Sequence, residues 1–331
     1  MQERRPARVI SLLSGGLDSC LAVRVLQQQS ATVIGLSFTT PFFGAALAHK
    51  AARQLNIPLI IKDITPEHLK LVKAPLYGYG KTMNPCIDCH ALMLRVAGQL
   101  MDEQQADALA TGEVLGQRPM SQNRRALQIV AKHSGYEEYI IRPLCAQLLA
   151  PTKPEQEGII DRSKLLALNG RSRKPQIAMA AQFGITEYPN PAGGCLLTDQ
   201  GFSRRLRDLL AHQPDPAIRE LELLRYGRQA RLSGQSKLLV GRDATDNEFL
   251  RQRYDAQRDV LLYAENFPGP TCLLVGQISS QETERAAAIC AAYSDAPAGH
   301  ACMVHISSPD GQRRQSVAAD KNQRLQPGDW V

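Results

Sequence analysis

Apolar residues in the first part of the chain come in short runs that alternate with amphipathic stretches. Short apolar runs are typical of buried strands, and apolar residues three or four apart are typical of helices. The pattern predicts strands over Val9–Leu13, Thr32–Phe38, Leu59–Ile64, Ala108–Thr111 and Glu138–Arg142. It predicts helices over Leu17–Gln28, Gly44–Leu55, Cys89–Glu103, Ser121–Lys132, Lys153–Leu168 and Lys174–Phe183. This alternation indicates an α/β domain built on a mostly parallel sheet with helices on both faces.

The pattern changes near residue 200. Asn190–Gly194 breaks the alternation, and a charged helical segment, Phe202–Leu224, follows. Beyond it lie one helix, Ser280–Tyr293, and short apolar runs over Lys237–Val240, Val260–Tyr263, Thr271–Val275 and Cys302–Ile306. Short runs separated by turns indicate a small mixed α+β domain with an antiparallel sheet. We therefore expect an α/β domain over residues 1–200, a linking helix over 201–225 and a smaller domain over 226–331.

The most specific segment follows the first predicted strand and reads Ser14-Gly15-Gly16-Leu17-Asp18-Ser19. Glycines let the chain turn tightly and let its N–H groups approach a phosphate. The start of the next helix adds donors and a partial positive charge. Ser14 and Ser19 add hydroxyl groups, and Asp18 suits Mg²⁺. The segment therefore predicts a phosphate site, with an ordinary strand-to-helix turn as the alternative.

Other polar residues follow the predicted strands. The carboxyl ends of parallel strands meet at one edge of a sheet, where ligands bind. Phe38 ends one strand, and Thr111-Gly112-Glu113 ends another, with Gln117 shortly after it. We expect Glu113 and Gln117 to face a nucleotide or Mg²⁺ and Ser121 to cap the next helix; the alternative is a plain glycine-rich connection. The segment Pro66–Pro85 is expected to be a long loop over the pocket.

The chain has eight cysteines, three of which lie in a suggestive pattern. Cys86 and Cys89 form a C-x-x-C pair, and Cys195 follows two glycines. Three thiolates suit a [4Fe–4S] cluster with one open iron. Zn²⁺ bound with help from His90, a redox pair or persulfide, and a covalent haem site are the alternatives. The other five cysteines are expected to pack as small apolar residues.

The glycine segment Ser14–Ser19 resembles the PP-loop of the ATP pyrophosphatases. Together with Thr111-Gly112-Glu113, Leu115-Gly116-Gln117, Ser121-Gln122 and Arg142-Pro143-Leu144, it resembles the PP-loop domain of tRNA 4-thiouridine synthetase over roughly residues 7–185. Cys86, Cys89 and Cys195 resemble the cysteine set of iron–sulfur-dependent tRNA thiolases. The resemblance implies a Rossmann-like PP-loop fold and an ATP-dependent tRNA sulfurtransferase that makes thiouridine.

The same resemblance implies the roles of individual residues. Pyrophosphate would lie on Ser14, Gly15, Gly16 and Ser19, with Asp18 near Mg²⁺. The nucleotide set would be completed by Phe38, Gly112, Glu113 and Gln117. Sulfur would reach an adenylated uridine carbonyl from a cluster or a persulfide on Cys86, Cys89 and Cys195, supplied by a donor protein or by inorganic sulfide.

The second half is similar to the NFACT-type RNA-binding domain. The residues that carry this resemblance are Gly241–Phe249, Arg258–Leu262 and Phe267–Pro270. The net charge of +7 permits a polyanionic partner. The cations that we expect to meet RNA phosphates are Arg204, Arg205, Arg207, Lys237, Arg242, Arg251 and Arg253.

The remaining expectations concern compartment and partners. No apolar run approaches the roughly 20 residues that a membrane helix needs, and the apolar stretch after the basic start is too short for a signal peptide. We therefore expect a cytoplasmic protein that acts on tRNA, with a homodimer left open. Two other functions stay open: a PP-loop enzyme that adenylates a small molecule, and an RNA-binding protein without catalysis.

Overall fold

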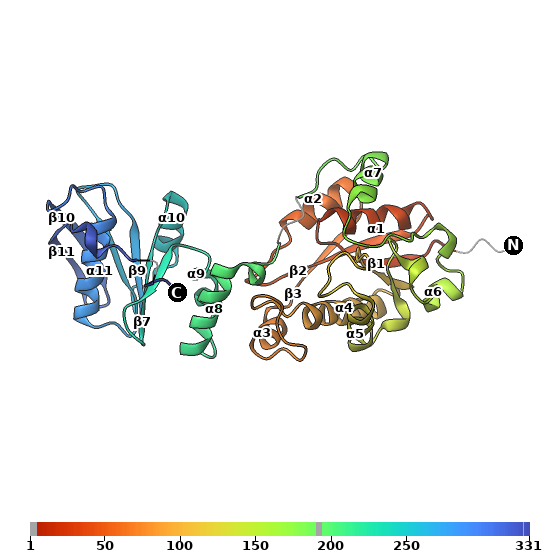
Figure 1. Ribbon diagram of the computed structural model, residues 1–331, viewed down its shortest axis with the longest axis horizontal. Helices are drawn as coiled ribbons and strands as arrows, with labels where there is room; N and C mark the ends of the chain where they lie inside the picture. The colour runs from red at the N-terminus through yellow and green to blue at the C-terminus, as the bar shows by residue number, and fades with distance from the viewer. Residues whose placement is uncertain (1–4, 190–193, 327) are drawn as a thin grey trace. The chain divides into compact units, whose positions relative to one another are not determined.

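The computed structural model describes residues 5–189, 194–326 and 328–331 (Figure 1). The chain divides into two compact units, Met1–Asp199 and Gln200–Val331. Residues 201–225, predicted as a linking helix, are grouped with the second unit. Most of the predicted break at Asn190–Gly194 lies outside the described residues.

The first unit is built on a five-stranded parallel sheet with the order β3-β2-β1-β4-β5. Its strands are β1 (Arg8–Leu12), β2 (Thr32–Thr39), β3 (Leu59–Asp63), β4 (Ala108–Ala110) and β5 (Ile140–Ile141). The central strand, β1, pairs through Val9 with Val33 on one side and with Ala108 on the other. The chain order reverses direction at β1, which makes the crevice beside its carboxyl end the expected ligand site.

Helices cover both faces of this sheet (Figure 1). One face packs against α1 (Leu17–Gln27), α2 (Ala46–Leu55) and α7 (Lys174–Gln182). The other packs against α3 (Thr65–Lys73), α4 (Cys86–Glu103) and α5 (Arg124–Ser134). The α/β class and the parallel sheet predicted from the hydrophobic pattern are thereby confirmed.

The second unit is built on a six-stranded antiparallel sheet with the order β11-β10-β8-β9-β7-β6. Its strands are β6 (Arg228–Arg231), β7 (Ser236–Val240), β8 (Val260–Ala264), β9 (Thr271–Gly276), β10 (Ala301–Ser308) and β11 (Gly311–Ala318). Helix α11 (Ser280–Tyr293) packs on one face. Residues of α9 (Ile218–Leu223) and α10 (Ala244–Gln252) pack on the other, and α8 (Gln200–His212) begins the unit. The predicted antiparallel sheet is confirmed, although β6, β11 and α10 were not predicted.

Two predicted segments are wrong. Lys153–Leu168 is not one helix but α6 (Lys153–Gln156) and a 3₁₀ turn, Arg162–Lys164. Gly158, with φ of +67°, turns the chain out of the helix. Pro66–Pro85 is not one long loop, because α3 occupies its first part. Pro66 lies in the first turn of α3. A backbone N–H there would have no partner within the helix, so proline loses no hydrogen bond at this position.

Two helix starts also differ from the prediction. Helix α4 begins at Cys86, one turn before the predicted Cys89, and the Cys89 N–H donates to the Pro85 carbonyl at 2.9 Å. Helix α5 begins at Arg124 and is capped by Asn123, whose side chain accepts from Ala126 N, rather than by Ser121. Among the described residues, no helix is long and apolar enough to cross a membrane.

Close packing between α4 and the turn after α5 gives the first testable prediction. A Cβ on Gly98 would lie 2.1 Å from Cδ2 of Tyr136, whose hydroxyl donates to Asp102 at 2.6 Å. We expect Gly98→Ala to lower the free energy of unfolding by about 1–3 kcal/mol, although alanine favours helices. Urea unfolding measures the change. The exposed neighbour Gln99→Ala is the control, and equal stability of Gly98→Ala and wild type would contradict the prediction.

Candidate active site

The glycine segment forms the turn between β1 and α1. Gly15 has φ of +79°, and a Cβ there would lie 2.4 Å from the backbone carbonyl of Leu47. Only glycine fits this position. The Ser14 hydroxyl accepts from Gly16 N at 3.3 Å, and the Ser19 hydroxyl donates to Gly16 O at 2.8 Å. Gly16 is the N-cap of α1 and has no side chain to occupy the helix start, so this turn presents the geometry of an anion site.

Asp18 lies in the first turn of α1, and only one of its two carboxylate oxygens has a hydrogen-bond partner among the described residues. Its Oδ2 accepts from the side-chain amide of Gln117 at 2.7 Å. Its Oδ1 is buried and has no hydrogen-bond partner among the described residues. A buried carboxylate oxygen without a partner is costly and suits a cation. The residue therefore fits the predicted Mg²⁺ role.

Gly112 brings the end of β4 against the start of α1. A Cβ on Gly112 would lie 2.5 Å from Ser19 N and 2.6 Å from the Asp18 carbonyl carbon. This contact leaves no room for a side chain. The structure thus brings together two segments that are about 95 positions apart in the sequence, and the sequence analysis assigned both to one pocket.

Glu113 is buried and binds three side chains. Its carboxylate accepts from Arg142 Nε at 2.9 Å and from Thr111 Oγ1 at 3.1 Å, and it lies 3.1 Å from His90 Nδ1. Burial raises the pKa of Glu113, but the Arg142 charge and the His90 contact outweigh burial and lower the pKa to about 2. Both carboxylate oxygens are engaged within the protein. In this structure Glu113 holds β4, β5 and α4 in place.

Two other predicted nucleotide residues are also engaged by the protein. Phe38, at the end of β2, belongs to the apolar core and is 5% exposed. The Gln117 side chain donates to Asp18 and accepts from Gln176 at 3.1 Å. Gln117 therefore orients Asp18, and α7 supports it.

The first turn of α4 carries Cys86 and Cys89 three positions apart, which places them on one side of the helix. Asn84 donates to Cys86 Sγ at 3.2 Å. Cys195 precedes a short turn that is fixed to the first unit: Leu196 N donates to Phe42 O at 3.0 Å and Thr82 Oγ1 to Leu197 O at 2.6 Å.

Burial and the neighbouring thiols raise the pKa values of Cys89 and Cys195. Burial, then the neighbouring Cys195 and Cys86, raise the pKa of Cys89 well above its usual range. Burial raises the pKa of Cys195 to about 11, and Cys86 adds to the shift. Among the described residues, no three His, Cys, Asp or Glu side chains are arranged to hold one metal ion. The ligands of a four-iron cluster bind different irons, so this finding bears on a single ion such as Zn²⁺ and leaves the cluster untested.

Some residues of this edge were not assigned by sequence reasoning. His90 was weighed only as a zinc ligand or as part of a haem-attachment motif, and Gln176 was not considered. Arg142 entered only as part of a resembling motif. A buried glutamate at a strand end signals the need for a cation, but the sequence does not say which one.

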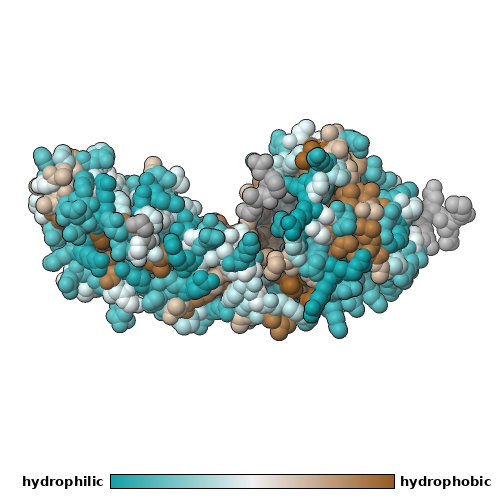
Figure 2. All heavy atoms as spheres, viewed as in Figure 1, coloured by the Kyte–Doolittle hydropathy of each residue, from teal (hydrophilic) through white to brown (hydrophobic). Residues whose placement is uncertain are grey.

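Several cations expected to meet RNA are paired within the second unit. Arg242 Nε lies 2.6 Å from Asp246 Oδ2, and Arg253 Nε lies 2.8 Å from Glu222 Oε2. Lys237 is buried. Arg204 and Arg207 on α8 are exposed. The visible face of this unit is largely hydrophilic (Figure 2).

Comparison with known families supports both resemblances. Residues 5–149 match the family model described as thiamine biosynthesis protein (ThiI), and residues 227–331 match that of the NFACT protein RNA binding domain. Both expected resemblances are confirmed for these segments.

Similar proteins share part of the chain. A tRNA-specific 2-thiouridylase MnmA from Methylobacterium nodulans is 28% identical over 160 residues, 43% of this chain and 42% of that protein. Its counterpart from Methylobacterium sp. (strain 4-46) is 25% identical over 71% of this chain and 62% of that protein. The chain thus spans about half the length of these curated relatives. A 4-thiouridine synthetase solved with RNA and ATP shares 23% identity over 48% of this chain and 40% of that chain, at a TM-score of 0.33.

The buried carboxylate gives a prediction about acid stability. The pKa of Glu113 is lowered from 4.5 to about 2 in the folded protein, so its ionised form stabilises the fold above pH 4.5. That contribution, about 3 kcal/mol, is lost as the pH falls from 4.5 toward 2. We expect Glu113→Gln to be less stable than wild type at pH 7 by about this amount, with a difference that shrinks at pH 3.

Urea unfolding at several pH values measures the difference. Glu103→Gln, an exposed change at the end of α4, is the control and should alter stability little. A difference for Glu113→Gln that stays constant from pH 7 to pH 3 would contradict the assigned pKa.

Proposed function

We propose that the protein is an ATP-dependent tRNA sulfurtransferase that makes thiouridine. The observation that carries the proposal is a continuous series of contacts at the carboxyl edge of the sheet. Cys89 is followed by His90, which contacts Glu113, and the adjacent Gly112 packs against Asp18 and Ser19. The phosphate turn and the cysteine helix are therefore parts of one arrangement.

The first chemical step is adenylation of the uridine. A carbonyl oxygen is a poor leaving group, so it must be activated. The uridine oxygen attacks the α-phosphate of ATP, a bond to the bridging oxygen breaks, and pyrophosphate leaves. Ser14, Ser19 and the N–H groups of the Gly15–Gly16 turn hold the pyrophosphate, and Asp18 holds Mg²⁺, oriented by Gln117. Phe38, Gly112 and Glu113 complete the pocket from the core side, with Glu113 acting as a positioning residue.

The second step replaces oxygen by sulfur. A sulfur nucleophile attacks the activated carbon, the carbon–oxygen bond breaks and AMP leaves with the oxygen. Cys86, Cys89 and Cys195 are the residues proposed to deliver this sulfur. With a persulfide, a second cysteine must release the transferred sulfur, which leaves a disulfide and requires a thiol reductant. A donor protein loads a cysteine thiolate by transferring the outer sulfur of its own persulfide. Inorganic sulfide forms the persulfide by attacking the disulfide left after transfer, which releases the other cysteine as a thiolate, or it would bind to the cluster.

The same cysteines are the proposed ligands of a [4Fe–4S] cluster. The donor set fits such a group, because three neighbouring thiols leave one iron free of protein ligands. When bound, the cluster would supply a site for an additional sulfide. Zn²⁺ is the alternative, and His90 would then bind it through Nε2, because its Nδ1 contacts Glu113.

The RNA substrate is proposed to bind through the second unit. On one face of its sheet, Tyr263 stacks on His305 at 4.8 Å, and Arg251 lies over the Tyr263 ring at 5.6 Å. Arg314 on β11 is opposite His305 in the strand register. Aromatic rings beside arginines are suited to stack bases and contact phosphates.

The proposed function predicts separable defects. Asp18→Asn should abolish both tRNA-dependent pyrophosphate release and thiouridine formation, because Mg²⁺ loses its ligand. Cys195→Ala should retain pyrophosphate release and lose thiolation by at least about 100-fold, the scale expected when a nucleophilic residue is removed. Cys302→Ala, a core cysteine of the second unit, is the control.

Pyrophosphate assay and nucleoside mass spectrometry provide the two readouts. Pyrophosphate release without RNA would favour a small-molecule substrate instead. No pyrophosphate release under any condition would leave an RNA-binding protein without catalysis.

The cluster has its own test. We expect protein purified without oxygen to show a broad absorption band near roughly 400 nm and about four irons per chain. Both should be lost in Cys195→Ala. A colourless protein that contains zinc or no metal would overturn the cluster and leave the persulfide route.

A further inference from the structure

A cavity of about 470 Å³ lies within the second unit, on the face of the sheet that also carries Tyr263 and His305. It is lined by residues of α8, α9, β6, β7 and β9 and by the turn before β8. Its polar lining comprises His212, Gln213, Arg219, Glu220, Arg231, Gln235, Lys237, Arg258, Asp259 and Gln277. Nothing in the proposed chemistry uses this cavity.

Lys237 is the unusual member of this lining. It lies in β7, where Arg231 on β6 and Val275 on β9 flank it in register. The strand pleat directs Leu238 into the core under α11 and Lys237 to the opposite face. Lys237 is only 5% exposed, yet its ammonium group has no hydrogen-bond or ion-pair partner among the described residues. Burial lowers its pKa to about 8, with Asp208 opposing the shift, so most of it is charged at pH 7.

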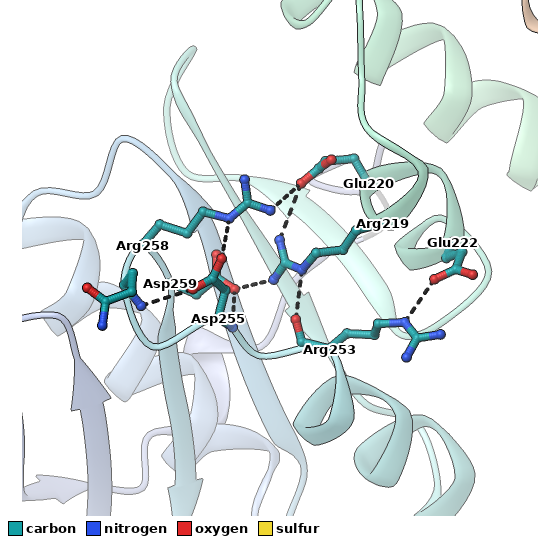
Figure 3. A network of polar contacts seen from close by, with 8 residues as sticks. Arg219, Glu220, Glu222, Arg253, Asp255, Arg258 and Asp259 are labelled. Atoms are coloured by element: carbon teal, nitrogen blue, oxygen red, sulfur yellow. Dashed lines mark hydrogen bonds and ion pairs between the residues drawn. The ribbon is translucent and has the colours of Figure 1, made fainter. Parts of the chain in front are cut away.

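The other cations of the cavity are already neutralised. Arg231 makes two contacts of 2.9 Å with Asp208. Figure 3 shows Arg219 between Glu220 and Asp259, and Arg258 between Glu220 and Asp255. Within the described ranges, Lys237 is therefore the one cation of this cavity's lining that has no hydrogen-bond or ion-pair partner. Lysine is seldom buried without a partner, since desolvation of the ammonium is costly.

We propose that this cavity binds a phosphate group of RNA, with Lys237 as its charged anchor. The proposal rests on the proposed function for its choice of RNA. The cavity has room for more than the phosphate itself, and the amides of Gln213, Gln235 and Gln277 offer donors and acceptors for the attached ribose or base. A free phosphate or mononucleotide presents the same chemistry and is the competing source.

The test uses the full chain with two variants, Lys237→Gln and Lys237→Met. The methionine side chain is nearly as long as that of lysine and is apolar, so it suits a buried position. Because both remove a buried charge, their melting temperatures should equal or exceed that of wild type. Arg285→Gln is the matched control: it removes an exposed charge on α11, on the other face of the sheet.

The main measurement is the affinity for an unmodified tRNA transcript at several salt concentrations. We expect both Lys237 variants to bind the tRNA about tenfold more weakly than wild type at about 0.1 M salt. At this salt concentration the loss of one phosphate contact is measurable. The slope of log K against log salt should fall by about 0.9, the value for one lost contact. Arg285→Gln should keep the slope. Unchanged affinity and slope in folded Lys237 variants would overturn the RNA assignment.

A second measurement separates the sources and the two proposals. If inorganic phosphate or AMP raises the melting temperature of wild type but not of Lys237→Gln while tRNA affinity is unchanged, the cavity binds a free phosphate compound and RNA is wrong. If neither probe distinguishes the proteins, phosphate is wrong altogether. A third outcome is a salt slope that depends on Lys237 in a protein that releases no pyrophosphate with tRNA. That result would support the proposed phosphate site and contradict the proposed sulfurtransferase function.

Discussion

The arrangement of the carboxyl edge of the first sheet depends on one buried carboxylate. Glu113 sits at the end of β4 with 6% of its surface exposed, and an ionised group in such a position must be paired. Its partners come from α4 through His90 and from the end of β5 through Arg142. The next residue back, Gly112, touches the first turn of α1. Satisfying this charge therefore fixes α4, which carries Cys86 and Cys89, against the same strand whose end packs on the glycine turn Ser14–Ser19.

The second unit manages buried charge differently. Asp259 is 1% exposed and accepts from Arg219 and from the Asp255 N–H, within a network that joins α9 to the start of β8 (Figure 3). Removing one partner from such a network would leave a buried charge, which is strongly destabilising. Lys237, close to this network, has no hydrogen-bond or ion-pair partner in the part of the chain that the structure describes. Because its buried ammonium group pairs with no acidic side chain among the described residues, the presence of Lys237 is better explained by ligand binding than by a contribution to stability.

Sequence periodicity located most elements of both sheets, because buried strands and amphipathic helices impose a local pattern on apolar residues. It failed where another signal prevailed. Lys153–Leu168 has helical spacing, but Gly158 in the left-handed region ends the helix after one turn. Strand β11 was missed because it is an edge strand whose exposed side chains show no apolar alternation. Helix α3 was missed because proline near its start resembled a loop signal.

The sequence by itself determined the parallel α/β class, the glycine turn at the first strand and the cysteine pair, because each depends on residues close together in the chain. Only the tertiary structure decided that Gln117 orients Asp18, that Arg142 and His90 pair with Glu113, and that Lys237 is buried rather than presented to RNA on the surface. These contacts join residues that are distant in sequence. Their formation depends on strand order, register and burial, which local composition does not encode.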